Sequence, residues 1–348
     1  MLASPSAHDL PVLDRWEPLK LSVRHLLGTS QLSREDITAI FHTALWMRDE
    51  VLRARRPVDL LAGRTVVNLF VENSTRTRSS FELAERRLGA NPVNFSAEAS
   101  SIAKGESLLD TVRNIEAMHV DAIVIRHSAA LVPWFLAERC TSVFINAGDG
   151  RHEHPTQGLL DALTLYEVWA RRDTAAGRPL LPPEAVFAGK RITIVGDILH
   201  GRVALSNVYA LQKLGAEVAV CAPPTLMPRG IEELGVRRFH RLDEAIEFSD
   251  AMNMLRIQRE RQDRAFFPSM GEYSGLFGLN HRMLRTVRKD LVILHPGPIN
   301  RGIELDSETA DGPRSVILGQ VENGVAIRMA VLAMLLPGKS DAVKLESM

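Results

Sequence analysis

The segment Ser74-Thr75-Arg76-Thr77-Arg78 places five polar side chains that can donate hydrogen bonds next to one another. It follows the β-branched run Thr65 to Val71 and precedes apolar residues at helical spacing, so we expect a strand, a turn and then a helix capped by Asn73 or Ser74. A helix start offers backbone N–H groups and the positive end of the helix dipole, and arginine side chains match phosphate oxygens. A capped helix with solvated arginines would explain one arginine, whereas five donors at one turn favour a phosphate-binding site.

Two other segments could suggest sites. His152-Glu153-His154 could bind a metal ion, but two histidines supply only two ligands and no third is identifiable. The run Arg191 to Asp197, followed by Gly201, could open a dinucleotide-binding fold, but the GxGxxG spacing is absent. We therefore predict no metal site and no cofactor.

The composition limits the class of protein. The 348 residues include 42 Lys and Arg and 42 Asp and Glu, and this zero net charge argues against a general binder of nucleic acid or of anionic membranes. The residues Met1 to Lys20 lack the apolar core of a signal peptide, and we expect no segment that spans a bilayer. Two cysteines, neither in a CxxC pair, indicate no disulfide framework. The cytoplasm is the expected compartment.

The elements that would position these residues alternate between strands and helices. Apolar, β-branched runs predict strands at 65–71, 121–125, 142–145, 191–195, 217–221, 251–255 and 291–294. An exposed connection at Arg171 to Pro183 separates them into two groups, after an expected helix at Leu159 to Ala170. A last helix is expected at Glu322 to Leu336, where Pro337-Gly338 would end it. Such a terminal helix must pack against another part of the chain. The predicted fold class is α/β with two domains, each a parallel-rich sheet flanked by helices.

Further motifs accompany the phosphate segment. The segment Ser74 to Arg78, with Ser79-Ser80-Phe81, resembles the carbamoyl-phosphate signature of the aspartate and ornithine carbamoyltransferase family. The other motifs stand in the order of that family: Lys104-Gly105-Glu106-Ser107, Arg126-His127, His154-Pro155-Thr156-Gln157, Gly196-Asp197 and His295-Pro296-Gly297-Pro298. The resemblance extends from about Leu21 to Leu336, and several motifs in order are far more specific than any one of them.

The resemblance implies a division into domains. Residues 1–165 with about 315–348 would form a carbamoyl-phosphate-binding domain, and residues 166–314 an aspartate-binding domain. The C-terminal helix would then pack back on the first domain.

The second half of the chain indicates which amine would accept the carbamoyl group. Arg256-Ile257-Gln258 and Gly201-Arg202 resemble the segments with which the aspartate enzymes hold the aspartate carboxylates. The ornithine enzymes carry a cysteine in an H-C-L-P segment, where this chain has Pro296 after His295. Ser269-Met270-Gly271 does match a tripeptide of the ornithine enzymes, but its neighbours resemble a loop of the aspartate enzymes.

The implied reaction is that of an aspartate carbamoyltransferase, an early step of pyrimidine (UMP) biosynthesis. Carbamoyl phosphate and L-aspartate would give N-carbamoyl-L-aspartate and phosphate. An ornithine or other amino-acid carbamoyltransferase is the first alternative. A non-catalytic scaffold homologue is the second alternative, since a fold can persist without its activity.

The resemblance also implies a role for each candidate residue. Phosphate would be held by Ser74, Thr75, Arg76 and Thr77, and the carbonyl oxygen would be polarised by Thr77, Arg126 and His154. The carbamoyl NH2 group would be fixed by Gln157 and by the backbone of the segment that contains Pro296, Gly297 and Pro298. Aspartate would be held by Arg202, Arg256 and Gln258, with Glu72 and Glu260 orienting these arginines.

Lys104, with Ser100 four residues earlier, would reach from one subunit into the active site of its neighbour. The resemblance therefore implies at least a homotrimer with shared active sites, since heterologous contacts close into rings. Without the resemblance, residues 99–106 would be a flexible polar loop. Whether a regulatory chain or a dihydroorotase-like partner binds this chain stays an open question.

Overall fold

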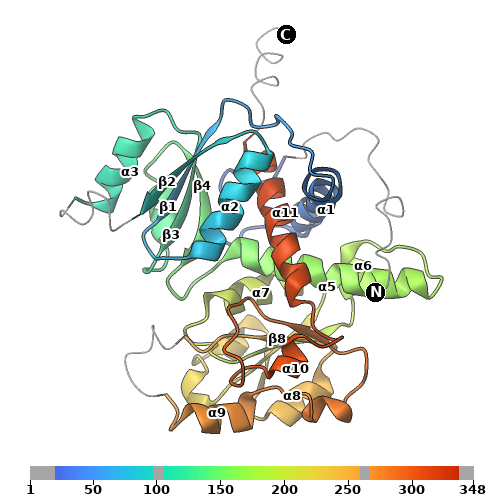
Figure 1. Cartoon of the computed structure of the whole chain (residues 1–348). Coiled ribbons are helices and arrows are strands. Elements are labelled where there is room, and N and C mark those ends of the chain that lie inside the picture. Colours follow the sequence, from blue (N-terminus) through green and yellow to red (C-terminus); the bar gives the residue numbers. More distant parts are fainter. Residues whose placement is uncertain (1–19, 97–105, 259–265, 337–348) are drawn as a thin grey trace. The chain divides into compact units, whose positions relative to one another are not determined.

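The computed structural model describes residues 20–96, 106–258 and 266–336 (Figure 1). These residues form two compact units. Unit 1 contains the described residues up to Thr156 and those from Glu322 onward, and unit 2 contains the described residues of Gln157–Val321. The residues Ser100, Lys104 and Glu260 of the predicted site lie outside the described residues.

The sheet of unit 1 has four parallel strands in the order β2-β1-β3-β4. Their bounds are β1 (Thr65–Phe70), β2 (Asn91–Ser96), β3 (Ala122–His127) and β4 (Val143–Asp149). The three strands that the sequence predicts in this unit are confirmed. The strand that it does not predict, β2, lies at the edge and contains Pro92, a residue that edge strands tolerate because they need fewer backbone donors.

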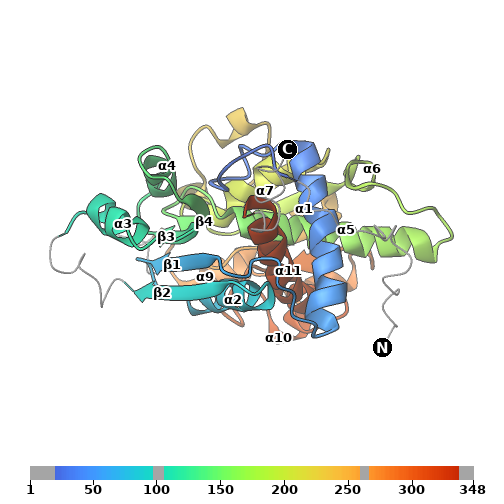
Figure 2. The same cartoon turned by 90° about the horizontal axis from the view of Figure 1, so that it is seen from above.

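Helices cover both faces of this sheet (Figure 2). Side chains alternate along β1, so that Val67 and Leu69 face one side, where they pack in a cluster with Val112 and Leu136. Asn68 faces the other side, where its amide donates to Glu85 across 2.8 Å. The helices that lie wholly in the described part of this unit are α1 (Arg34–Trp46), which continues as the π-helix η2 (Met47–Arg53), α2 (Thr75–Arg87), α3 (Leu108–Glu116) and α4 (Val132–Ala137).

The sheet of unit 2 has five parallel strands in the order β7-β6-β5-β8-β9. Their bounds are β5 (Arg191–Val195), β6 (Glu217–Cys221), β7 (Arg237–Phe239), β8 (Ala251–Met254) and β9 (Val292–Leu294). Four of them match predicted strands closely. The fifth, β7, was not predicted because it is a three-residue edge strand that begins with two arginines.

The α-helices of this part of the chain are α5 (Pro155–Ala175), α6 (Pro183–Phe187), α7 (Arg202–Lys213), α8 (Leu242–Phe248), α9 (Met270–Phe277) and α10 (Ser307–Ala310). Short 3-10 turns are η5 (Pro224–Leu226), η6 (Ile231–Leu234) and η8 (Met283–Arg285). The helix expected at Leu159 to Ala170 is thus confirmed in a longer form, α5.

The last helix, α11 (Ile317–Leu335), packs on unit 1 from Glu322 onward, as predicted. Arg53 of η2 forms an ion pair with Glu322 at 2.7 Å. On the other side, Arg328 donates to Ser80 Oγ of α2 across 3.0 Å. Figures 1 and 2 show this part of α11 beside both α1 and α2. Segments from opposite ends of the chain therefore build one unit.

The same helix corrects the expectation that no segment could span a bilayer. By length and composition alone, α11 is long and apolar enough to do so. However, 72% of its apolar window is buried, and every residue of Val325–Leu335 is buried. Its apolar character is that of a core helix.

Candidate active site

In unit 1, the predicted phosphate segment lies at the carboxyl edge of the sheet. Glu72 and Ser74 follow β1, and Arg126 lies near the end of β3, in register with Phe70. The backbone N–H of Val71 donates to the Arg126 carbonyl across 2.9 Å, which continues the pairing beyond β1. Ligands of open α/β sheets bind at this edge, because parallel strands end there together.

The predicted helix start is confirmed at Ser74, the N-cap of α2. Its φ of −157° is extended, and its hydroxyl donates to Thr77 Oγ1 across 3.0 Å instead of capping a backbone N–H. The first turn carries no acidic residue. The first-turn N–H groups and the helix dipole therefore suit an anion. The helix ends at Arg87, and Gly89 beyond it adopts a φ of +78°, in the left-handed region that favours glycine.

Arg126 is held from two sides. Its Nη1 donates to the Ala147 carbonyl across 2.9 Å, and its Nη2 lies 3.1 Å from Glu72 Oε1. Only 12% of the Arg126 side chain is exposed. Glu72 therefore has a partner, Arg126, that sequence reasoning did not name. This pairing fixes the guanidinium at the edge where a phosphorylated substrate would bind.

Sequence reasoning missed a second cation in unit 1, Arg328. It is buried, donates to Ser80 Oγ and to the Gly324 carbonyl, and lies 5.0 Å above the Phe81 ring. Burial and the charge of Arg126 lower the pKa of Arg328 to about 10. The signal in the sequence is a lone arginine in the otherwise apolar stretch Val325–Leu335 of this helix, which a search for motifs does not detect.

The carboxylate between the two histidines of the 152–154 segment has a structural use. Glu153 is fully buried and accepts hydrogen bonds from Thr29 N and Oγ1, both at 2.7 Å, and from Ser30 Oγ at 2.6 Å. A Cβ at Gly28 would lie 2.2 Å from Glu153 Oε1, so this approach depends on glycine. These bonds use the carboxylate that a metal site would need. His154 is buried and directly precedes α5.

In unit 2, the predicted aspartate-binding segment follows β8 at the carboxyl edge. The backbone of this segment is held by two buried carboxylates. Ile257 N donates to Glu304 Oε1 across 2.9 Å, and Gln258 N donates to Asp197 Oδ2 across 3.4 Å. Asp197 belongs to a predicted motif, whereas Glu304 was not predicted. Arg202 is the first residue of α7 and is buried.

The His295 to Pro298 segment follows β9 and is also held at both ends. Its first N–H, that of His295, donates to Gln320 Oε1 across 3.0 Å. Two residues beyond it, Asn300 donates through its backbone and its side chain to Glu304, at 2.8 and 2.7 Å. Between these anchors Gly297 has a φ of +65°, which a glycine adopts without strain.

Gln157, the last residue of the His154 to Gln157 motif, belongs to unit 2. Its side-chain Nε2 donates to Asp161 Oδ1 across 2.8 Å. The amide therefore has a fixed direction, with its nitrogen toward the buried carboxylate.

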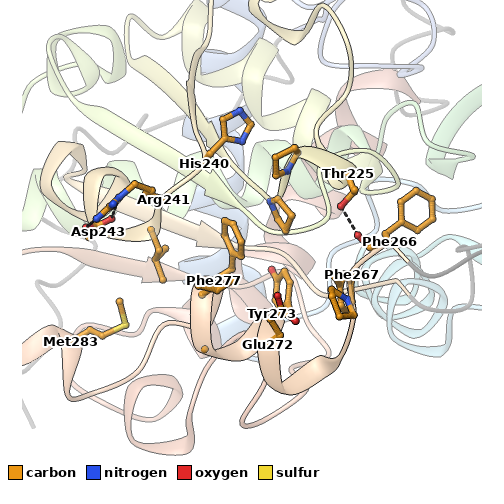
Figure 3. Close-up of a pocket in the computed structure, with 16 residues that line it drawn as sticks. Thr225, His240, Arg241, Asp243, Phe266, Phe267, Glu272, Tyr273, Phe277 and Met283 are labelled. Atoms are coloured by element: carbon orange, nitrogen blue, oxygen red, sulfur yellow. Dashed lines mark hydrogen bonds and ion pairs between the residues drawn. The ribbon is translucent and has the colours of Figure 1, made fainter.

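A separate cavity of about 630 Å³ in unit 2 contains none of the predicted site residues (Figure 3). Its wall includes the aromatic side chains of Phe266, Phe267, Tyr273 and Phe277. The tripeptide that matches the ornithine enzymes begins the helix beside it, where Ser269 Oγ accepts from Glu272 N across 3.1 Å.

Two parallel α/β units with polar residues at the carboxyl edges of their sheets define a two-domain α/β enzyme. Within this class, the chain belongs to the aspartate/ornithine carbamoyltransferase family. Residues 24–167 match the model of its carbamoyl-P binding domain, and residues 188–335 match that of its Asp/Orn binding domain.

The chain is similar to proteins named aspartate carbamoyltransferase catalytic subunit. It is 54% identical to that of Gemmatimonas aurantiaca, over 91% of this chain and 95% of the relative, and 50% identical to that of Syntrophotalea carbinolica, over 91% and 96%. Among solved structures, aspartate transcarbamoylase from Trypanosoma cruzi with carbamoyl phosphate and aspartate gives a TM-score of 0.79 at 30% identity, over 92% of this chain and all of that one. The same enzyme with N-(phosphonacetyl)-L-aspartic acid gives 0.77 at 31% identity, over 92% and 99%.

Proposed function

We infer that this chain is the catalytic chain of an aspartate carbamoyltransferase, which transfers the carbamoyl group of carbamoyl phosphate to L-aspartate. The observation that carries the inference is the 54% identity to an aspartate carbamoyltransferase catalytic subunit over nine tenths of both chains. The anion-binding start of α2 and the Arg256-Ile257-Gln258 segment supply the two kinds of site that this reaction needs.

Carbamoyl phosphate is bound through its phosphate by Ser74, Thr75, Arg76 and Thr77 in this proposal. Thr77, Arg126 and His154 stabilise the negative charge on the carbonyl oxygen in the transition state. The Glu72 pairing of Arg126 supports this role, because a guanidinium fixed in advance costs no reorganisation when charge develops. Lys104 and Ser100 of the neighbouring subunit complete the carbamoyl-phosphate site.

The amine nitrogen of aspartate attacks the carbamoyl carbon, the bond from that carbon to the phosphate oxygen breaks, and the departing phosphate accepts the amine proton. No protein nucleophile is required, because phosphate is a good leaving group and positioning lowers the barrier. Arg202, Arg256 and Gln258 hold the aspartate carboxylates. Their geometry is supported by the buried Asp197 and Glu304, which hold the backbone of residues 257 and 258. Glu260 orients the arginines of this half-site.

We assign the carbamoyl-phosphate role to residues 1–165 with about 315–348, and the aspartate role to residues 166–314. The pathway is pyrimidine biosynthesis, in the cytoplasm. The assembly is a homotrimer in which Lys104 is shared between subunits. Mixing Lys104→Ala subunits with His154→Ala subunits, each inactive alone, tests the shared site: mixed trimers regain activity, and no recovery after subunit exchange would contradict it.

The function is tested by incubating the purified chain with carbamoyl phosphate and L-aspartate and identifying the product by mass spectrometry. N-carbamoyl-L-aspartate should appear in equal amount to phosphate. N-(phosphonacetyl)-L-aspartic acid, which joins features of both substrates, should inhibit. Phosphate binding without any turnover would identify a scaffold homologue instead.

A further inference from the structure

Asp161 of α5 lies at the centre of a cluster of buried amide side chains in unit 2. Its carboxylate is fully buried and accepts a hydrogen bond from each of four amides, at 2.7 to 3.0 Å. The donors come from α5, α7, β8 and α11, and are Gln157, Asn207, Asn253 and Gln320. A Cβ at Gly158 would lie 2.8 Å from the Ser206 carbonyl oxygen, so a glycine there allows α7 to approach α5 this closely.

The two carboxylate oxygens serve different pairs of amides. Oδ1 accepts from Gln157 and Gln320, and Oδ2 accepts from Asn207 and Asn253. An ionised carboxylate can only accept hydrogen bonds. Each of the four amides must therefore turn its NH2 group toward Asp161.

Two of the amides are fixed in this direction by a second partner. The N–H of His295 donates to Gln320 Oε1, and Asn207 Nδ2 also donates to the Val203 carbonyl across 3.1 Å. One fixed donor thus faces each oxygen, and a proton on either oxygen would point at an N–H group. The cluster therefore favours the ionised form, although burial raises the pKa of Asp161.

The direction of Gln157 matters for the substrate. With its nitrogen held by Asp161, its Oε1 lies on the opposite side of the amide. The NH2 group of carbamoyl phosphate is a hydrogen-bond donor and needs acceptors such as this oxygen. Gln320 acts in parallel, because it joins Asp161 to the first N–H of the His295 to Pro298 segment, whose backbone is the second proposed contact of that NH2 group.

We propose that Asp161 is a positioning residue that fixes both sets of acceptors for the carbamoyl NH2 group, Gln157 directly and the His295 to Pro298 segment through Gln320. The inference rests on the proposed function and deepens it. Recognition of carbamoyl phosphate in preference to an acyl phosphate without NH2 is thus a property of the buried cluster. Asn207 and Asn253, on the other oxygen, serve the fold alone.

The test compares Gln320→Met with Asn207→Ala, each of which removes one amide donor to Asp161. For each variant, thermal stability, the KM for carbamoyl phosphate and the inhibition constant of acetyl phosphate are measured. Acetyl phosphate carries CH3 where carbamoyl phosphate carries NH2, so a loss of acceptors should not weaken its binding.

Gln320→Met should raise the KM for carbamoyl phosphate at least about tenfold. It should raise the inhibition constant of acetyl phosphate by less than about threefold. Asn207→Ala should lose comparable stability while both constants stay within about threefold of the unmodified enzyme. If Gln320→Met does not fold, Asp161→Asn, which preserves the side-chain volume, should show the same selective loss.

Equal weakening of carbamoyl phosphate and acetyl phosphate, or equal effects of the two variants, would overturn the inference and leave Asp161 a support of the fold. An active unmodified enzyme with an unchanged KM in Gln320→Met would overturn it too, while the proposed function stands. An unmodified enzyme that does not turn over carbamoyl phosphate with L-aspartate would overturn the proposed function, and with it this inference, which rests on that function.

Discussion

The guanidinium of Arg126 lies 3.1 Å from the Glu72 carboxylate, so an ion pair joins the end of β3 to the segment that follows β1. The pair is only partly exposed, and the second guanidinium nitrogen donates to the Ala147 carbonyl. Arg126 therefore has a defined direction in unit 1.

Replacing Glu72 by Gln should allow the Arg126 guanidinium to adopt other orientations. We expect kcat to fall about 10- to 100-fold, because the guanidinium must then reorganise when charge develops on the carbonyl oxygen. Glu82→Gln is a matched control, since Glu82 pairs with Arg86 at 3.0 Å on the exposed face of α2. A normal kcat in Glu72→Gln would show that the pair is structural only.

Replacing Arg76 by Ala should weaken phosphate recognition. A charge-assisted hydrogen bond contributes about 1.5 to 3 kcal/mol, so the KM for carbamoyl phosphate should rise about 10- to 150-fold. Inhibition by inorganic phosphate should weaken in parallel, since the same contact holds both. Arg86→Ala, at the far end of the same helix, should change neither constant. Equal effects of the two variants would contradict the assignment of Arg76 to the phosphate site.

Replacing Glu304 by Gln should weaken the binding of aspartate. In Gln, an NH2 group replaces one of the two carboxylate oxygens, which accept from Ile257 N and Asn300 N. This NH2 group would face a backbone N–H, so two donors would meet with no acceptor between them. The backbone before Gln258 should shift, and the KM for aspartate should rise about tenfold or more. Steady-state kinetics with each substrate varied in turn measures this. An unchanged KM for aspartate would show that Glu304 does not position the segment.

Stability should depend on pH through Glu85. Burial raises the pKa of Glu85 from 4.5 to about 8, so the folded protein keeps a proton that the unfolded chain releases above pH 4.5. The free energy of unfolding should therefore decrease between about pH 4.5 and pH 8. This decrease should be absent in Glu85→Gln, because the Gln side chain does not titrate. The free energy of unfolding of Glu85→Gln minus that of the unmodified protein should therefore be more positive at pH 9 than at pH 5, by on the order of 3 to 5 kcal/mol.

Chemical denaturation of both proteins at the two pH values measures this difference, in which the other titrating groups cancel. Gln can also keep the hydrogen bond that Asn68 Nδ2 donates to Glu85. A difference between the two proteins that stays constant with pH would show that Glu85 is ionised in the folded state.

The strands predicted from the sequence are those whose apolar character comes from burial on both faces, such as β5 and β6. The two that escaped prediction are edge strands, where Pro92 in β2 and paired arginines in β7 are tolerated because less of the strand is buried. Pattern reasoning detects burial, and these strands have little of it.

The candidate site divides in the same way. Residues in compact motifs, such as Ser74 to Thr77, could be found because neighbours in sequence remain neighbours in space. Asp161, Glu304 and Arg328 could not be found, because their partners stand far away in the chain: Asp161 meets amides from positions 46 to 159 residues distant, besides Gln157. Only the packed tertiary structure brings such groups together.

The proposed acceptor of the carbamoyl group is the amine of L-aspartate. Phosphate release from carbamoyl phosphate, measured with L-aspartate and with L-ornithine in parallel, tests it most directly. We predict turnover with aspartate and none above the background hydrolysis with ornithine. Turnover with ornithine and not with aspartate would contradict the account.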